Sequence, residues 1–173
     1  MEKILDSIQK SLDNQNWYSA LVLSLIVPDI CSKLEGDDKS SSKRYPDWFN
    51  KYLGEKYFNF LSGDDCYSLR CSFLHEGIGN IENQSRKDVL DHIVFTPNGG
   101  HCSKISNCNF GNSKYNNKEI LKLSTFQFCQ DIISAAKEWL TDVKNDNVIQ
   151  ENIQELITID EAGFSIGNAI LMK

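Results

Sequence analysis

The spacing of apolar residues predicts two helices at the start of the chain. The segment EKILDSIQKSL places four apolar residues on one face of an amphipathic helix: Ile4, Leu5, Ile8 and Leu12. A second helix begins near Asn16 and runs past Asp29, and it is apolar nearly all round, as expected at the centre of a helical bundle. Pro28 lies inside this second helix and predicts a kink there.

The middle of the chain predicts a loop, some helical turns and then one well-defined helix. The polar stretch EGDDKSSSKR predicts a loop, and YPDWFNKYLGEKYFNFL carries aromatic residues at helical spacing, which predicts one or two short helices. Ser62 followed by Asp65 resembles a capping box, and Gly77 is a natural helix end. The pattern therefore predicts a helix from about Gly63 to Glu76.

Residues 80–123 differ in composition, because they are rich in Asn, Gly and Ser. The runs HIVFT and EILKL predict short strands that flank a turn at PNGG. Ser124 and Gln127 then predict the start of another helix. The apolar stripe of that helix contains Phe128, Ile132, Ala135 (or Ala136) and Trp139. The run VIQENIQELI predicts a short last helix, and the tail TIDEAGFSIGNAILMK predicts a strand pair or a flap.

Together these elements predict a single, mainly α domain over residues 1–173. We expect an antiparallel helical bundle whose core covers about 1–79 and 124–157. A small β-containing insertion occupies about 80–123, and a C-terminal tail occupies 158–173.

Composition adds that this is an ordinary globular chain. It has 173 residues, 40% hydrophobic and 24% charged, which is enough for a sizeable core. The net charge of −6 excludes a protein that coats nucleic acid by bulk charge, but it allows a local site for one phosphate. The amino terminus lacks the pattern of a secretory signal, and Pro28 and Asp29 interrupt the longest apolar run. We therefore expect a cytoplasmic protein without a membrane partner, whose six cysteines are reduced thiols.

Arg70 interrupts the apolar run CYSLRCSFL of the predicted helix 63–76. At about 100° per residue, Arg70 falls in the middle of an apolar arc. The arc consists of Cys66, Tyr67, Leu69, Cys71, Phe73 and Leu74. On the opposite, polar side lie Ser68, Ser72 and Glu76. The periodicity thus predicts that Arg70 lies against packed surface rather than in bulk water.

A guanidinium in that place needs an anionic partner, because it keeps its charge when buried. One interpretation is a structural ion pair, for which Asp29 on the central helix is the candidate partner. The other interpretation is a phosphate-binding arginine in a cleft or at a subunit interface. The spacing alone leaves both interpretations open.

His75 falls at the border of the same arc, about 140° from Arg70 around the helix. An imidazole titrates near neutral pH, as proton transfer requires, although a histidine at a helix end is also an ordinary structural feature. One ideal helix does not aim both side chains at one point. Joint action therefore needs a frayed last turn before Gly77, or a second copy of the helix related by a two-fold axis.

Other candidate chemistry is less well supported by the spacing. Four residues are of types that bind zinc, without the tight spacing of a zinc knuckle: His92, His101, Cys102 and Cys108. Cys71 and His75 stand four positions apart, but a catalytic pair lacks a third, orienting group. Four cations form either a basic rim or solvated surface: Lys43, Arg44, Arg86 and Lys87. We therefore expect no metal and no cofactor.

The stretch RCSFLH, residues 70–75, fits the R-x4-6-H motif of the HEPN superfamily (higher eukaryotes and prokaryotes nucleotide-binding domains). The wider phrase SGDDCYSLRCSFLHEG also resembles prokaryotic HEPN-like proteins that carry LRCxLLHEG-type segments. The resemblance covers about residues 17–79. It implies a HEPN-like antiparallel helical bundle that forms a homodimer, with the two motifs facing each other across the interface.

Many HEPN proteins are metal-independent endoribonucleases, and several belong to toxin–antitoxin or anti-phage defence systems. The resemblance implies that Arg70 binds the scissile phosphate and stabilises charge in the transition state. It implies that His75 is the general acid or base when the ribose 2′-OH attacks the phosphorus, leaving a 2′,3′-cyclic phosphate. The implied partners are RNA, a second copy of the chain, and a cognate antitoxin or regulatory protein.

Cys71 departs from the family pattern, because active HEPN nucleases commonly have Asn, Asp or His directly after the arginine. The alternative to a ribonuclease is a non-catalytic HEPN-like module that binds a nucleotide, an RNA or a protein partner. In that alternative Arg70 is held structurally.

Overall fold

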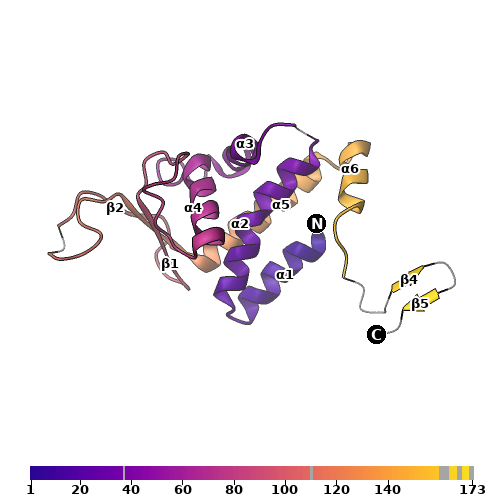
Figure 1. Cartoon of the computed structure of the whole chain (residues 1–173), viewed down its shortest axis with the longest axis horizontal. Coiled ribbons are helices and arrows are strands. Elements are labelled where there is room, and N and C mark those ends of the chain that lie inside the picture. The colour runs from indigo at the N-terminus through magenta and orange to yellow at the C-terminus, as the bar shows by residue number, and fades with distance from the viewer. Residues whose placement is uncertain (37, 110, 160–163, 167–168, 172–173) are drawn as a thin grey trace.

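The computed structural model describes all residues except 37, 110, 160–163, 167–168 and 172–173. Within the described residues, six helices make up most of the fold, so the mainly α class is confirmed (Figure 1). The helices are α1 (Glu2–Asp13), α2 (Trp17–Leu34), α3 (Ser41–Leu53), α4 (Gly63–Glu76), α5 (Thr125–Asp142) and α6 (Asn147–Gln154). The strands are β1 (His92–Thr96), β2 (Ser103–Ile105), β3 (Ile120–Ser124), β4 (Phe164–Ile166) and β5 (Ala169–Leu171).

The central helix of the bundle is α2, which contacts α1, α3, α4, α5 and α6. It starts where predicted, and the side chain of Asn16 caps it by accepting a hydrogen bond from the backbone N–H of Ser19. Helix α2 is long and apolar enough to cross a membrane, by length and composition only. Its packing against five other helices explains that composition, since a central helix needs an apolar surface all round.

Helix α4 has the predicted bounds and the predicted ends. The hydroxyl of Ser62 accepts from the backbone N–H of Asp65 at 3.1 Å, and Gly77 has a φ of 73°, in the left-handed region that favours glycine. Gly63 allows α4 to begin close to α3, because a Cβ at this position would lie 2.5 Å from the carbonyl oxygen of Pro46.

The predicted polar side of α4 is only partly exposed, because Glu76 is exposed whereas its two serines are buried. Ser68 and Ser72 are buried, and Ser72 Oγ donates to the carbonyl of Asn80 in the insertion at 2.6 Å. The carboxylate of Asp65 accepts the backbone N–H groups of residues 88–90 at 2.7–3.3 Å. It therefore ties the insertion to α4 instead of closing the predicted capping box.

The insertion contains a three-stranded sheet in the order β1–β3–β2. Strands β1 and β3 confirm the runs HIVFT and EILKL as strands, but they pair in parallel, with Phe95 opposite Leu123. Parallel neighbours require a long connection, so these two strands do not simply flank a turn at PNGG. The connection includes β2, which pairs antiparallel with β3.

Helix α3 begins at Ser41, so the predicted loop over residues 35–44 is shorter than expected. Tyr45, near the start of α3, is fully buried, and tertiary packing overrides the weak helix preference of the serines. In its described part the tail forms one of its two predicted structures, the antiparallel pair β4–β5, which Figure 1 shows beyond α6.

Helices α5 and α6 confirm the predictions for the end of the bundle. The hydroxyl of Ser124 accepts from the backbone N–H of Gln127 at 3.3 Å, as expected for the start of α5. The whole predicted apolar stripe is buried: Phe128, Ile132, Ala135, Ala136 and Trp139. The short last helix predicted from VIQENIQELI is α6.

Candidate functional site

Arg70 lies against α2 and pairs with Asp29, the partner named by the structural interpretation of the sequence. Nη2 of Arg70 is 2.8 Å from Oδ2 of Asp29, and the two side chains are 24% and 12% exposed. Arg70 is therefore mostly buried, as the helical arc predicted. Burial works to lower its pKa, but the Asp29 carboxylate and the Cys71 thiol raise it, and the pKa stands above its usual value.

Asp29 also binds two groups from the start of α3. Ser41 Oγ donates to Oδ1 of Asp29, and Nη2 of Arg44 lies 3.6 Å from the same oxygen. One carboxylate on the central helix thus holds two arginines, from α3 and α4, close to each other. We call Asp29, Ser41, Arg44 and Arg70 the Asp29 cluster.

The Asp29 cluster lines an open pocket of about 480 Å³ formed by α2, α3, α4 and the segment after α6. Three cations line it: Lys33, Arg44 and Arg70. Asp29 is the one carboxylate among the described lining residues. Apolar side chains complete the wall: Ile26, Ile30, Leu34 and Leu156. The pocket is locally positive in a chain whose net charge is −6.

Hydrogen bonding within the Asp29 cluster is incomplete. Nε of Arg44, Nε of Arg70 and Oδ2 of Asp29 have no hydrogen-bond partner in the described part of the chain. The close contact between Arg70 and Asp29 is thus an ion pair whose atoms are not aligned for a hydrogen bond. Unsatisfied buried polar groups are uncommon in folded proteins and are often found at functional sites.

His75 is exposed at the C-terminal end of α4 and does not line the pocket of the Asp29 cluster. Five positions separate it from Arg70, which corresponds to roughly 7.5 Å along the helix axis and about 140° around it. Within one chain the structure therefore does not bring Arg70 and His75 to the same point. Among the described residues, none forms a hydrogen bond or an ion pair with the His75 side chain.

The residues of zinc-binding types do not gather at one place. The ring of His92 packs edge-on against Tyr115, whereas Nε2 of His101 lies 3.1 Å from the hydroxyl of Tyr57. In the part of the chain that the structure describes, no three His, Cys, Asp or Glu side chains are close enough to hold a metal ion. All six cysteines are free thiols.

Only one of the four cations considered for a basic rim reaches the pocket. Arg44 lines it, whereas Arg86 pairs with Asp64 at 2.5 Å and Lys87 pairs with Asp91 at 2.8 Å. Two further residues of the pocket, Lys33 and Ser41, were not predicted. The signal for Lys33 was its place four positions after Asp29 on one helix. The sequence offers no comparable signal for Ser41.

A second buried carboxylate, Asp131 on α5, was also missed by sequence reasoning. Tyr57 donates to it at 2.8 Å and Gln127 at 2.7 Å, and Lys56 forms an ion pair with it. His101 joins the same group through the Tyr57 hydroxyl. We call these residues the Asp131 cluster. It ties α5 to the loop between α3 and α4 and to the insertion.

Comparison of the chain with protein-family models, with curated proteins and with solved structures gave no match. The HEPN resemblance therefore stays a prediction that residues 17–79 carry, above all the motif from Arg70 to His75.

Proposed function

We propose that this protein binds RNA at the pocket of the Asp29 cluster and acts as a metal-independent endoribonuclease of HEPN type in the cytoplasm. The observation that carries the proposal is the charge of the pocket. Lys33, Arg44 and Arg70 outnumber the single carboxylate of Asp29. Guanidinium groups match the geometry of phosphate oxygens, so a backbone phosphate is the natural ligand of such a place.

Asp29 gives the pocket its form. Without this carboxylate, Arg44 and Arg70 would repel each other. With it, both side chains are held close to each other before a ligand arrives. Binding then loses less side-chain entropy. The buried Nε atoms of both arginines have no hydrogen-bond partner among the described residues, so the cluster is not completed by the protein's own groups.

Cleavage requires two copies of the chain, because Arg70 and His75 point to different sides of α4. In the proposed homodimer, each RNA phosphate lies between Arg70 of one subunit and His75 of the partner subunit. The imidazole takes the proton of the 2′-OH while the 2′ oxygen attacks phosphorus. The bond to the 5′ oxygen breaks, and that oxygen takes up a proton from water. The products are a 2′,3′-cyclic phosphate and a 5′-hydroxyl.

The exposed, unpartnered position of His75 supports this role, since a proton-transferring group must be reachable by substrate. A cleavage activity of this kind would suit a toxin or a defence effector, with a cognate antitoxin or regulatory protein as its further partner. The second candidate function is a non-catalytic module that binds RNA, a nucleotide or a protein. The pairing of Arg70 with Asp29 and the presence of Cys71 after the arginine favour it.

Cleavage of single-stranded RNA in EDTA separates the two functions. We expect wild type to cleave, and Arg70→Ala and His75→Ala to lose about 10²- to 10⁴-fold in rate. Arg86→Ala is the matched control, because Arg86 also pairs with an aspartate but lies outside the pocket. Equal cleavage by all four proteins would contradict a catalytic role for Arg70 and His75. RNA binding that depends on Arg70, without cleavage by wild type, would establish the second candidate.

A further inference from the structure

The loop between α3 and α4 exposes two phenylalanines between two buried residues. Phe58 and Phe60 are 70% and 39% exposed, whereas Tyr57 and Leu61 are 1% and 3% exposed. Asn59 has a φ of 64°, in the left-handed region that asparagine tolerates better than most residues. Large exposed aromatic side chains that cluster at one place usually mark a binding surface.

The loop is held firmly from inside the protein. Tyr57 is anchored by its hydrogen bond to Asp131, and its carbonyl accepts the backbone N–H groups of Phe60 and Leu61 at 2.9 and 3.1 Å. Phe58 and Phe60 are therefore presented by an ordered turn. A preorganised aromatic surface binds a flat ligand with little loss of conformational entropy.

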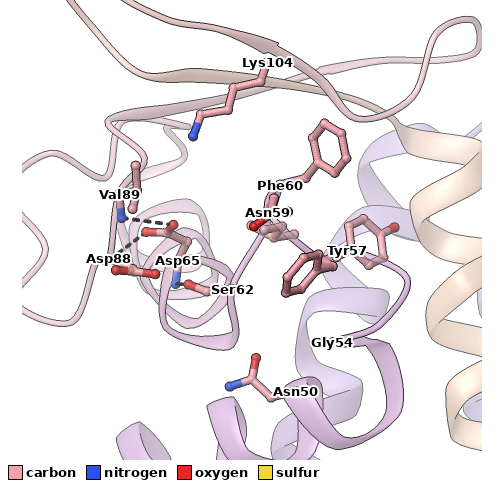
Figure 2. Close-up of a pocket in the computed structure, with 12 residues that line it drawn as sticks. Asn50, Gly54, Tyr57, Asn59, Phe60, Ser62, Asp65, Asp88, Val89 and Lys104 are labelled. Atoms are coloured by element: carbon pink, nitrogen blue, oxygen red, sulfur yellow. Dashed lines mark hydrogen bonds between the residues drawn. The ribbon is translucent and has the colours of Figure 1, made fainter.

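Both phenylalanines line a pocket of about 490 Å³, between the end of α3, the start of α4 and the insertion. In Figure 2, Tyr57 and Phe60 lie on the opposite side of this pocket from Asp65 and Asp88, and Lys104 of β2 reaches over it. We call this the Phe58–Phe60 pocket. It combines aromatic faces, on which bases can stack, with one cation for a phosphate and two carboxylates.

Two donor groups of the pocket can take a ligand. The amino group of Lys104 lies 3.6 Å from Glu119, which is longer than a hydrogen bond, so it can bind a phosphate. Asn50 uses its side-chain oxygen to accept the N–H of Gly63 at 2.8 Å. Its amide NH2 has no hydrogen-bond partner among the described residues and lies on the wall of the pocket (Figure 2).

The two acids of the pocket differ in what they can bind. The carboxylate of Asp65 already accepts three backbone N–H groups. The carboxylate of Asp88 accepts no hydrogen bond from the residues that the structure describes, so it can accept one from a ligand. Carboxylates accept hydrogen bonds from the exocyclic amine of cytosine. A base with an amino group is therefore a better fit to this wall than uracil.

We propose that the Phe58–Phe60 pocket binds unpaired nucleotides of single-stranded RNA. The bases stack on Phe58 and Phe60, a backbone phosphate binds Lys104, and an exocyclic amine donates to Asp88. This inference rests on the proposed function, because the nucleotides belong to the same RNA whose phosphate lies at the Asp29 cluster.

Helix α3 connects the two sites, since it carries Arg44 near one end and leads to Gly54 at the other. Ten residues of helix span roughly 15 Å, about the length of four stacked nucleotides at 3.4 Å each. A short single strand is therefore long enough to occupy both pockets.

The test measures the affinity for a short, fluorescent 2′-O-methyl RNA of mixed A and C by fluorescence anisotropy. The methyl group blocks attack by the 2′ oxygen, so binding is read whether or not the protein cleaves RNA. We expect Phe58→Ala and Phe60→Ala each to weaken binding about tenfold. The matched control is Phe126→Ala, because Phe126 is 40% exposed and lies outside the pocket.

Two further comparisons sharpen this test. Lys104→Ala should weaken RNA binding and lower the salt dependence of the binding constant by about one phosphate contact. The control is Lys137→Ala, on the exposed side of α5, which should change neither. Wild type should bind a C-rich strand more tightly than a U-rich strand, and Asp88→Asn should reduce that difference.

Equal affinity of the Phe58→Ala, Phe60→Ala double variant and of Phe126→Ala would overturn the inference. A double variant that binds RNA normally but no longer self-associates would also overturn it, and would make the pocket an interface between two copies. Failure of the proposed function has a different signature: Arg70→Ala would bind and cleave like wild type, while the two phenylalanine variants would still bind weakly.

Discussion

Asp29 and Asp131 are two buried carboxylates, each paired with cations. Only Asp131 has hydrogen-bond partners for both of its oxygens within the described residues. Asp131 is 2% exposed and accepts hydrogen bonds from Tyr57 and Gln127 besides its ion pair with Lys56. These donors come from separate parts of the chain. Asp131 therefore fixes how the elements pack.

The Asp29 cluster has the same kinds of groups in a looser arrangement. Arg44 and Arg70 share one carboxylate, the Nε atoms of both lack a partner among the described residues, and a pocket of about 480 Å³ opens beside them. A buried polar network specifies structure when it is satisfied, and is costly when it is only partly satisfied. The difference supports the proposal that Asp131 serves the fold, whereas the Asp29 cluster serves to bind an anion.

The largest expected difference concerns stability. Asp131→Asn should lower the free energy of unfolding by about 2–4 kcal/mol, because the new amide faces buried donors. Asp29→Asn should cost only about 1 kcal/mol, since Arg44 and Arg70 can reach solvent through the pocket. Urea denaturation of both variants measures this. A larger loss for Asp29→Asn would reverse the roles assigned to the two carboxylates.

In RNA binding the order of the two variants should be reversed, with the larger change in Asp29→Asn. Asp29→Asn keeps the shape of the side chain and an oxygen that can accept from the two arginines, so we expect their arrangement to be largely kept. The variant removes the negative charge from the proposed phosphate site. We expect about a threefold gain in affinity at low salt, which falls as salt is added. Asp131→Asn should not gain affinity, because Asp131 lies outside the Asp29 cluster, and it can only weaken RNA binding by loosening Tyr57 and the turn that presents Phe58 and Phe60. Fluorescence anisotropy at several salt concentrations checks both, and a loss of affinity in Asp29→Asn would speak against an anion site.

The smallest expected effect is that of pH on stability, and it arises mainly from His101 in the Asp131 cluster. Burial lowers the pKa of His101 below its usual value of 6.5, although the Asp131 carboxylate opposes this. The unfolded chain therefore binds a proton at higher pH than the folded chain does. Stability is unaffected above about pH 7 and falls as the pH drops below about 6.5. His92 adds to the fall, because burial and Lys114 lower its pKa as well.

Denaturation measured between about pH 7 and pH 5 should show this loss, by about 1 kcal/mol or less. In His101→Gln the loss over the same range should be smaller than in wild type. An equal pH dependence in the two proteins would mean that His101 does not contribute through its charge.

The sequence predicted the Asp29 cluster better than the Asp131 cluster, for a physical reason. The angle of Arg70 within α4 follows from the helix period alone, and a buried cation requires an anion, which pointed to Asp29. Gln127 precedes Asp131 by four positions on α5, which is a local spacing. The other partners of Asp131 come from the loop before α4 and from the insertion. No local pattern encodes contacts of that kind.

The same limit explains the errors in the fold. Periodicity assigned Ser68 and Ser72 to the polar side of α4, but it does not reveal that both are buried or that Ser72 binds the carbonyl of Asn80. The strands β1 and β3 were recognised by composition, but their parallel pairing depends on the long connection between them. Local signals predicted both ends of α4 and the start of α5, where a capping serine or a left-handed glycine acts within one turn.

The most direct test of the composite site is to mix two inactive variants, Arg70→Ala and His75→Ala, and to measure RNA cleavage in EDTA. If each site takes Arg70 from one subunit and His75 from the other, a mixed dimer has one complete site. Half of the dimers are then mixed, so the mixture should regain roughly a quarter of the wild-type activity. If wild type cleaves RNA but the mixture stays as inactive as each variant alone, the proposed arrangement of the two motifs across a dimer interface is contradicted.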